Sequence, residues 1–233
     1  MTALTSAAIE AWALLGAYPL RWLVIALVFL VVVEATMFIP RVGFTLKLAL
    51  ASVLGAQIVA LFHGAARGAV PSVFDLWRGL ALPADGLSVL VIGTLIPFVA
   101  GLIYLRVVNG PESLRFFFGS VVRDKPPKER EFVRFKYVMQ LASLPFTWLA
   151  GTVVLLGLGG VPAMSTALAA ARFSWEGVVL LGVMGIVFEW VAVALPRRLP
   201  RVAGVALVSV LLLGYLLWSF ALLYTLSVKA LTP

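Results

Sequence analysis

Six long apolar runs separated by short polar joints restrict the fold of this sequence more than any other feature. An apolar helix of roughly 17–25 residues can cross the hydrocarbon core of a bilayer while satisfying its own backbone hydrogen bonds. Only 12% of the residues are charged, against about 25% in soluble domains. The sequence therefore predicts an all-α polytopic membrane helix bundle, a single transmembrane domain over residues 1–233 with six transmembrane helices plus interfacial amphipathic helices. The predicted transmembrane helices occupy residues 22–39, 44–62, 87–105, 138–158, 177–195 and 202–226.

The N-terminal segment, residues 1–21, is apolar but interrupted. It carries Glu10 and runs into Pro19 and Arg21, which leaves almost no room for a turn before the first predicted span. We expect this segment to be an interfacial helix, and a seven-span arrangement stays open as the alternative.

Residues 63–86 are too polar to cross a membrane, but their apolar side chains should keep them close to it. A short interfacial helix is expected after Pro71. Asp75 and Arg78 are three positions apart, so they can form an ion pair on that helix.

Lysine and arginine are distributed unevenly between the two predicted sides of the membrane. Of the 18 basic residues, 13 fall at or beside the joints at 40–43, 106–137 and 196–201. Short loops rich in basic residues stay in the cytoplasm. The sequence therefore predicts that both termini lie outside the cytoplasm, and we expect a compact chain rich in Ala, Val and Leu to lie in a bacterial inner (cytoplasmic) membrane.

The 106–137 loop is the longest polar segment, and its basic residues are interleaved with phenylalanines. This pattern favours an amphipathic cytoplasmic loop at the headgroup level, where each basic residue adds about 1 kcal/mol of attraction to anionic lipid. The alternative is docking to a partner protein. Nucleic-acid binding is not expected, since contact with lipid accounts more simply for the phenylalanine rings of this loop. The predicted contact residues are Arg115, Phe116, Phe117, Arg123, Lys125, Lys128, Arg130 and Arg134.

Two acids, Glu34 and Glu189, lie inside predicted spans, where a charge costs about 2.5 kcal/mol or more. Both fall at similar depth from the predicted cytoplasmic side, and Lys47 and Gln140 belong to the same level. We predict a polar layer made of these four residues, with Glu34 paired to Lys47 across the first hairpin. The layer would hold helices or subunits in register, or its carboxylates would load and release a proton or cation.

Residue types exclude several kinds of chemistry. The chain has no cysteine and one histidine, so thiolate nucleophiles, cysteine-ligated metals and paired-histidine haem sites are ruled out. No catalytic, cofactor-binding or metal-ligating motif is present, and we predict no enzyme activity. The predicted function is an accessory or scaffolding subunit of a membrane protein complex, binding other membrane subunits and lipid. The alternative is a small proton- or cation-linked transporter or channel that uses Glu34 and Glu189.

Overall fold

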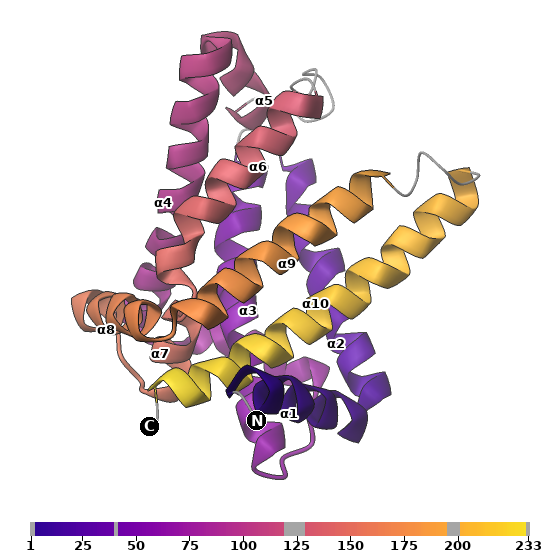
Figure 1. Cartoon of the computed structure of the whole chain (residues 1–233), viewed down its shortest axis with the longest axis vertical. Helices are drawn as coiled ribbons and strands as arrows, with labels where there is room; N and C mark the ends of the chain where they lie inside the picture. Colours follow the sequence, from indigo (N-terminus) through magenta and orange to yellow (C-terminus); the bar gives the residue numbers. More distant parts are fainter. Residues whose placement is uncertain (1–2, 40–41, 119–128, 195–200, 232–233) are drawn as a thin grey trace.

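The computed structural model describes residues 3–39, 42–118, 129–194 and 201–231 (Figure 1). In those ranges every regular element is a helix. The α-helices are α1 (Ala3–Ala17), α2 (Pro19–Ala35), α3 (Gly43–Ala66), α4 (Ala84–Asn109), α5 (Arg115–Phe118), α6 (Glu129–Ser143), α7 (Leu149–Leu155), α8 (Gly160–Phe173), α9 (Trp175–Ala194) and α10 (Arg201–Leu231). Short 3-10 helices are η1 (Thr36–Phe38), η2 (Val73–Ala81), η3 (Pro111–Leu114) and η4 (Leu144–Phe146).

Five described segments are long and apolar enough to cross a membrane, namely Pro19–Phe38, Gly43–Ala66, Ala84–Asn109, Arg130–Leu155 and Leu207–Leu231. A sixth candidate joins α8 to the first part of α9, and this pair is bent by 91°. The all-α bundle is therefore confirmed, with five candidate spans, or six if the bent pair counts as one. The predicted span at 177–195 falls on α9.

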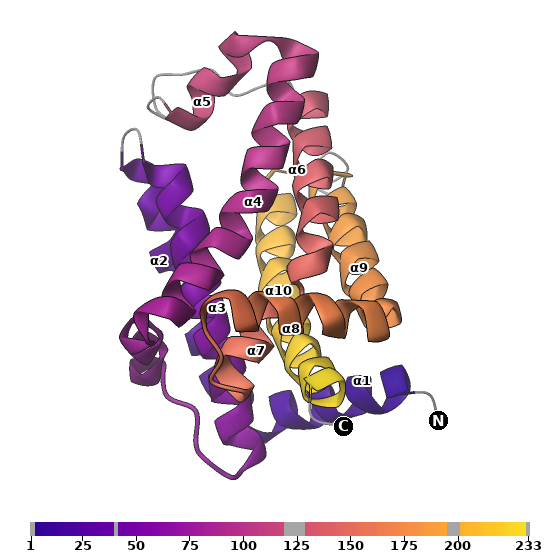
Figure 2. The ribbon, with the colours of Figure 1, turned by 90° about the vertical axis from the view of Figure 1, so that its left-hand side faces the viewer.

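The two ends of the bundle differ. The start of α1 and the end of α10 lie together at one end, which we call the terminus end, while η3, α5 and the start of α6 lie at the other, the loop end (Figures 1 and 2). At the terminus end the Thr225 hydroxyl donates to the Ala7 carbonyl at 3.1 Å, and Lys229 pairs with Glu10 at 2.9 Å. The α1 helix lies crosswise to α2, α3 and α4 in Figure 2, and at 15 residues it is shorter than a span requires.

The helical hairpin of α2 and α3 is held by aromatic packing near the terminus end. Trp22 and Phe62 stack with their ring centroids 3.9 Å apart, and the Trp22 indole donates to the Leu14 carbonyl at 3.0 Å. Both rings are buried. This contact links α1, α2 and α3 at one point, so the hairpin and the crosswise helix are positioned together.

The fourth span begins earlier than the hydropathy pattern predicts. Instead of starting at residue 138, α6 starts at Glu129, and the candidate span covers Arg130–Leu155. The added turns carry Phe132 and Phe135, which pack against α4 and keep the chain helical there. Near Pro145 the α-helix is interrupted by η4, as expected where a proline removes a backbone donor.

The sequence interpretation missed α8 altogether. This helix packs against α4 and α7, with Ala163, Ala167 and Ala170 buried at intervals of three and four residues. At 14 residues, it is too short to be recognised as a span.

Candidate functional site

The Glu34–Lys47 pair joins the first two spans near the loop end. Lys47 Nζ donates to both oxygens of the Glu34 carboxylate, at 2.6 and 2.8 Å. The predicted pairing is confirmed. Its position differs from the prediction, because 57% of the Glu34 side chain is exposed and 26% of the Lys47 side chain. Glu34 thus lies on the outer face of α2 and not inside the bundle.

The register of α2 explains why Glu34 points outward. Leu27, Val31 and Glu34 are spaced by four and three residues, which places them on one face of a helix. All three side chains are exposed, whereas Phe29 and Val33 on the opposite face are buried. We call Leu27, Val31 and Glu34 the α2 stripe. It is an apolar face with one carboxylate.

Gln140 lies deeper, on α6. Its amide donates to the Gly182 carbonyl of α9 at 2.9 Å, so the side chain ties the fourth span to α9. Glu189 belongs to α9, but its side chain lies outside the described part of the structure. Of the four residues predicted to form a polar layer, the structure brings Lys47 and Gln140 to one cavity and leaves Glu34 beside it.

The predicted contact residues of the 106–137 loop separate into three groups. Arg115, Arg130 and Arg134 are exposed at the loop end, and Arg115 pairs with Glu112 at 2.8 Å. Phe117 is buried, with 2% exposed, so its prediction as a lipid or partner contact is wrong. The remaining predicted contacts lie outside the described residues or have side chains outside them: Phe116, Arg123, Lys125 and Lys128.

Phe117 is buried because the loop end contains an aromatic cluster. Phe44 of α3, Phe98 of α4 and Phe135 of α6 surround the Phe117 ring, with centroids 4.8–5.9 Å from it. Aromatic pairs at such distances gain about 0.5–1.5 kcal/mol beyond their area burial. The rings that the sequence assigned to lipid therefore hold the loop end of the bundle together.

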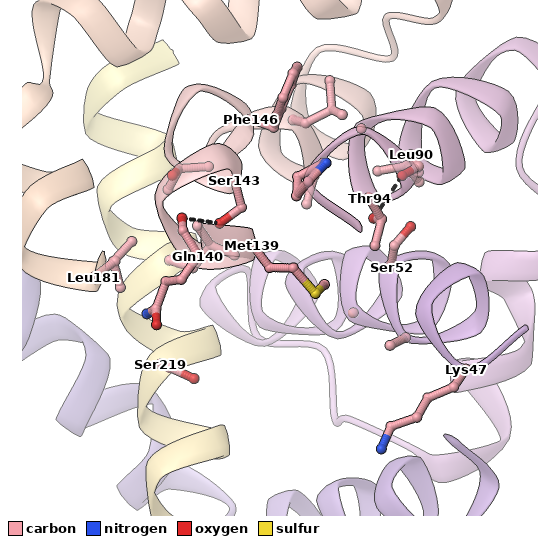
Figure 3. A pocket seen from close by; sticks show the side chains of 18 of the residues that line it. Lys47, Ser52, Leu90, Thr94, Met139, Gln140, Ser143, Phe146, Leu181 and Ser219 are labelled. Atoms are coloured by element: carbon pink, nitrogen blue, oxygen red, sulfur yellow. Dashed lines mark hydrogen bonds between the residues drawn. The ribbon is translucent and has the colours of Figure 1, made fainter. Parts of the chain in front are cut away.

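Next to this cluster the bundle forms a cavity of about 770 Å³ that is open to the outside. Its walls come from η1, α3, α4, α6, η4, α7, α9 and α10, and most of the lining is apolar. In Figure 3, Lys47 and Ser52 come from α3 and Gln140 from α6, and the Met139 side chain extends between these two walls. Ligand sites in proteins commonly enclose about 300–1,000 Å³ with a few placed polar groups.

The charged groups of the cavity gather at one end. Lys47 and Lys136 line it near the loop end, where α3 and α6 begin. The ammonium of Lys136 also lies 5.3 Å from the centre of the Phe132 ring. Among the described lining residues there is no aspartate or glutamate. Lys47 is already paired with Glu34, which lies beside the cavity, so this end carries charges of both signs.

Most of the hydroxyl groups that line the cavity donate hydrogen bonds to backbone carbonyls nearby in the chain. Those of Thr94, Ser143, Thr147 and Ser219 donate to carbonyls three or four residues earlier in their own helices, at 2.7–3.0 Å. Ser52 differs, because its Oγ is shielded from solvent and has no hydrogen-bond partner in the described part of the chain. A buried polar atom without a partner costs about 1–3 kcal/mol. Ser52 is therefore a polar lining residue whose hydroxyl is turned away from the open space of the cavity.

Sequence reasoning missed most of these cavity residues. Lys136 was counted among the basic residues of the loop, and Ser52 and Thr94 carry no motif. The spacing of Phe132, Phe135 and Met139 on one face of a helix was the signal that residues before 138 belong to the bundle. Within the described residues, no group of three or more His, Cys, Asp or Glu side chains gathers to hold a metal ion. Comparisons of the chain with models of known protein families, with curated proteins and with solved structures found no match.

Proposed function

We propose that this protein is a non-enzymatic accessory subunit of a membrane protein complex, and that the α2 stripe is the face that binds a partner. The observation that carries the proposal is the exposed carboxylate of Glu34 inside the candidate span Pro19–Phe38. An acid in such a position costs about 2.5 kcal/mol or more when lipid surrounds it.

The ion pair with Lys47 lowers this cost but leaves the carboxylate incompletely bonded. An ionised carboxylate offers about four acceptor positions, and Lys47 occupies two of them. A neighbouring transmembrane helix with a hydrogen-bond donor at the same depth would fill the others, and the exposed Leu27 and Val31 would pack against its apolar surface. Polar side chains between transmembrane helices typically add about 0.6–2 kcal/mol to association.

Photo-crosslinking in cells tests this face. A benzophenone amino acid at Val31 is expected to give one discrete protein adduct, identified by mass spectrometry. The same amino acid at Ile103, an exposed position of α4 at similar distance from the loop end, is the control and should give lipid adducts alone. Replacing Glu34 and Lys47 together by leucine should weaken the Val31 adduct. Lipid adducts alone at Val31 would contradict the proposal.

The exposed arginines of the loop end support a second part of the role. The exposure of Arg130 and Arg134 supports contacts with anionic headgroups, which the positive-inside rule favours if the loop end is the cytoplasmic face in a bacterial inner membrane. Native mass spectrometry of the purified protein should find less anionic lipid bound to the variant with Arg130→Gln and Arg134→Gln. Arg172→Gln, an exposed change on α8, serves as the control and should retain it. Equal retention by both variants would argue against headgroup contacts at the loop end.

A proton- or cation-linked transporter is the second candidate, and the cavity is the observation that favours it. Its described lining contains no carboxylate, so under this function Glu34, which is paired with Lys47 beside the cavity, would bind the proton or cation. Flux assays in liposomes decide the question. Under this second function Glu34→Gln abolishes proton or cation flux, and under the subunit function the wild-type protein alone carries none.

A further inference from the structure

The bend between α8 and α9 exposes side chains that suit neither hydrocarbon nor bulk water. Phe173 and Trp175 flank this bend, and both rings are exposed, that of Phe173 to 91%. Arg172 and Glu176, their neighbours in the chain, are exposed as well. Charged groups are costly in the hydrocarbon core, whereas aromatic rings are enriched where the core meets the headgroups. Together the four side chains favour the headgroup level for this bend.

The α9 helix is long enough to cross the membrane without α8. Its 20 residues rise about 30 Å at 1.5 Å each, which matches the hydrocarbon core of a typical bilayer. The α8 helix is bent by 91° from the first part of α9, and it runs crosswise to α4 and α6 in Figure 2. The start of α9 lies at the terminus end, since a Cβ built at Gly177 would be 3.5 Å from Cδ1 of Leu226 on α10. The α8 helix therefore lies close to the plane of the membrane where α9 enters it.

Two other segments of the terminus end combine exposed rings with exposed charges. On η2, Phe74 is 81% exposed and Arg78 is exposed beside it. On α1, Trp12 and Glu10 are both exposed. The α1 helix packs mainly on α10, η2 packs on α2 and α3, and α8 packs on α4 and α7, so the three segments lie against different helices of the bundle. The sequence predicts α1 and η2 at the interface, and α8 adds a third segment that the sequence interpretation missed.

We propose that α1, η2 and α8 form a collar in the headgroup layer at the terminus end, and that α9 crosses the membrane alone. The partner of this surface is the boundary between headgroups and acyl chains, where the rings contact the chains and the charged groups contact the headgroups. Interfacial aromatic and basic residues influence how a bundle tilts, so contacts against different helices hold its depth and tilt. Exposed charges of both signs meet at the bend, so the collar requires no anionic lipid. The inference is independent of the proposed subunit role, because it concerns the terminus end and not the α2 stripe.

Single spin labels test the depth of the collar in the full-length protein, in nanodiscs of phosphatidylcholine. The chain has no cysteine, so one introduced cysteine at Trp12, Phe74 or Phe173 carries the only nitroxide. Power saturation compares oxygen, which enters hydrocarbon, with a nickel chelate, which stays in water. We expect the nickel-to-oxygen accessibility ratio at all three positions to be at least fivefold above that at Ile96, an exposed residue in the middle of α4. The ratio should also be lower than that at Ala69, in the loop after α3.

The label at Phe173 decides the position of α8. A ratio equal to that at Ile96 would show that α8 is a re-entrant helix within the hydrocarbon core, and this result would overturn the proposal. A ratio equal to that at Ala69 would show that the bend stands in water, as expected if its rings were the docking site of another protein. That result would overturn the proposal as well.

A variant pair tests whether the two rings hold α8 at this level. In the variant with Phe173→Ser and Trp175→Ser, a label at Leu168, an exposed residue of α8, should become at least twofold more accessible to the nickel chelate. The variant with Phe173→Tyr and Trp175→Phe keeps both rings and should leave this label unchanged. An unchanged label at Ile96 in each variant shows that the bundle is still inserted. Equal accessibility at Leu168 in the two variants would overturn the anchoring of α8 by its rings.

Discussion

Gly101 of α4 provides a sharp test of how the loop end packs. A Cβ built at this position would lie 2.5 Å from Cε2 of Phe135 and 2.9 Å from Cγ of Met139, so neither neighbour can stay where it is. Overpacking of this kind costs about 1–3 kcal/mol. We therefore expect Gly101→Ala to destabilise the fold, although alanine is the better helix former.

Gly214 of α10 is the matched control, because a Cβ there meets no described atom within 4 Å. Both substitutions share the gain in helix propensity, about 0.5–1 kcal/mol. The difference in the free energy of unfolding between Gly101→Ala and Gly214→Ala therefore isolates the clash, and we expect about 1–3 kcal/mol. Unfolding of the purified protein by SDS in bicelles, followed by circular dichroism, measures it.

A compensating change identifies the residue responsible. In a Phe135→Leu background, Gly101→Ala should cost less, since the ring that blocks the methyl group is gone, and coupling between contacting residues is about 0.5–3 kcal/mol. If Gly101→Ala is as stable as Gly214→Ala in the wild-type background, α6 does not pack on α4 at this level. The start of the fourth span at residue 138, which hydropathy predicts, would then be correct.

Three further predictions follow from single contacts. A double-mutant cycle with Glu34→Gln and Lys47→Met should give a coupling energy above the range of about 0.2–1 kcal/mol seen for exposed pairs in water, because hydrocarbon surrounds the pair; a smaller value, measured by SDS unfolding, would place the pair in water. Because the chain has no cysteine, Ser113→Cys and Ala69→Cys can be labelled with an impermeant maleimide, and they should react from opposite faces of the membrane, with Ser113 reached only from the cytoplasm; labelling of both from one face would contradict the topology. Thr225→Val removes the hydrogen bond to the Ala7 carbonyl and should destabilise the docking of α1 by about 0.5–1.5 kcal/mol, seen as faster hydrogen exchange in α1; unchanged exchange would mean that α1 is held by other contacts.

Local sequence patterns predicted the features that depend on neighbours along the chain. The joint between the first two apolar runs is four residues long, so an antiparallel hairpin had to bring Glu34 and Lys47 to similar depth, and they pair. Asp75 and Arg78 were expected to pair on a short helix after Pro71, and they do so at 3.2 Å on η2. Each of these features is decided by fewer than 20 residues of chain.

Average hydropathy failed where charged and packed residues share one helix. The first turns of α6 contain Glu131, Arg134 and Lys136, whose charges lower the average so that the span seemed to start later. These charged residues alternate along the helix with Phe132 and Phe135, which pack inward. The periodic spacing of apolar residues identifies the packed face of such a segment, whereas the mean hydropathy does not show that face.

The cavity could not be predicted, because its lining comes from helices that are far apart in the sequence. Lys47, Thr94, Gln140 and Ser219 lie on four different helices. The sequence assigned Lys47 and Gln140 to a polar layer, whereas Thr94 and Ser219 carry no motif. Which of them face one another depends on how the helices tilt and how far apart they pass. Tilt is set by packing with neighbouring helices, and no single apolar run contains that information.

The helical register of α2 decides whether the carboxylate of Glu34 faces the interior of the bundle or its surroundings. Sequence depth alone placed two carboxylates in one polar layer, which would hold helices or subunits in register or load and release a proton or cation. Val33 is buried, and Glu34 is rotated about 100° from it, so the carboxylate points away from the core while Lys47 reaches into the cavity. Lys47 and Glu34 therefore form one ion pair at the edge of the cavity, with the carboxylate facing the surroundings. A hydrogen-bond donor on a neighbouring helix would fill the remaining acceptor positions of this carboxylate, as the proposed subunit role requires.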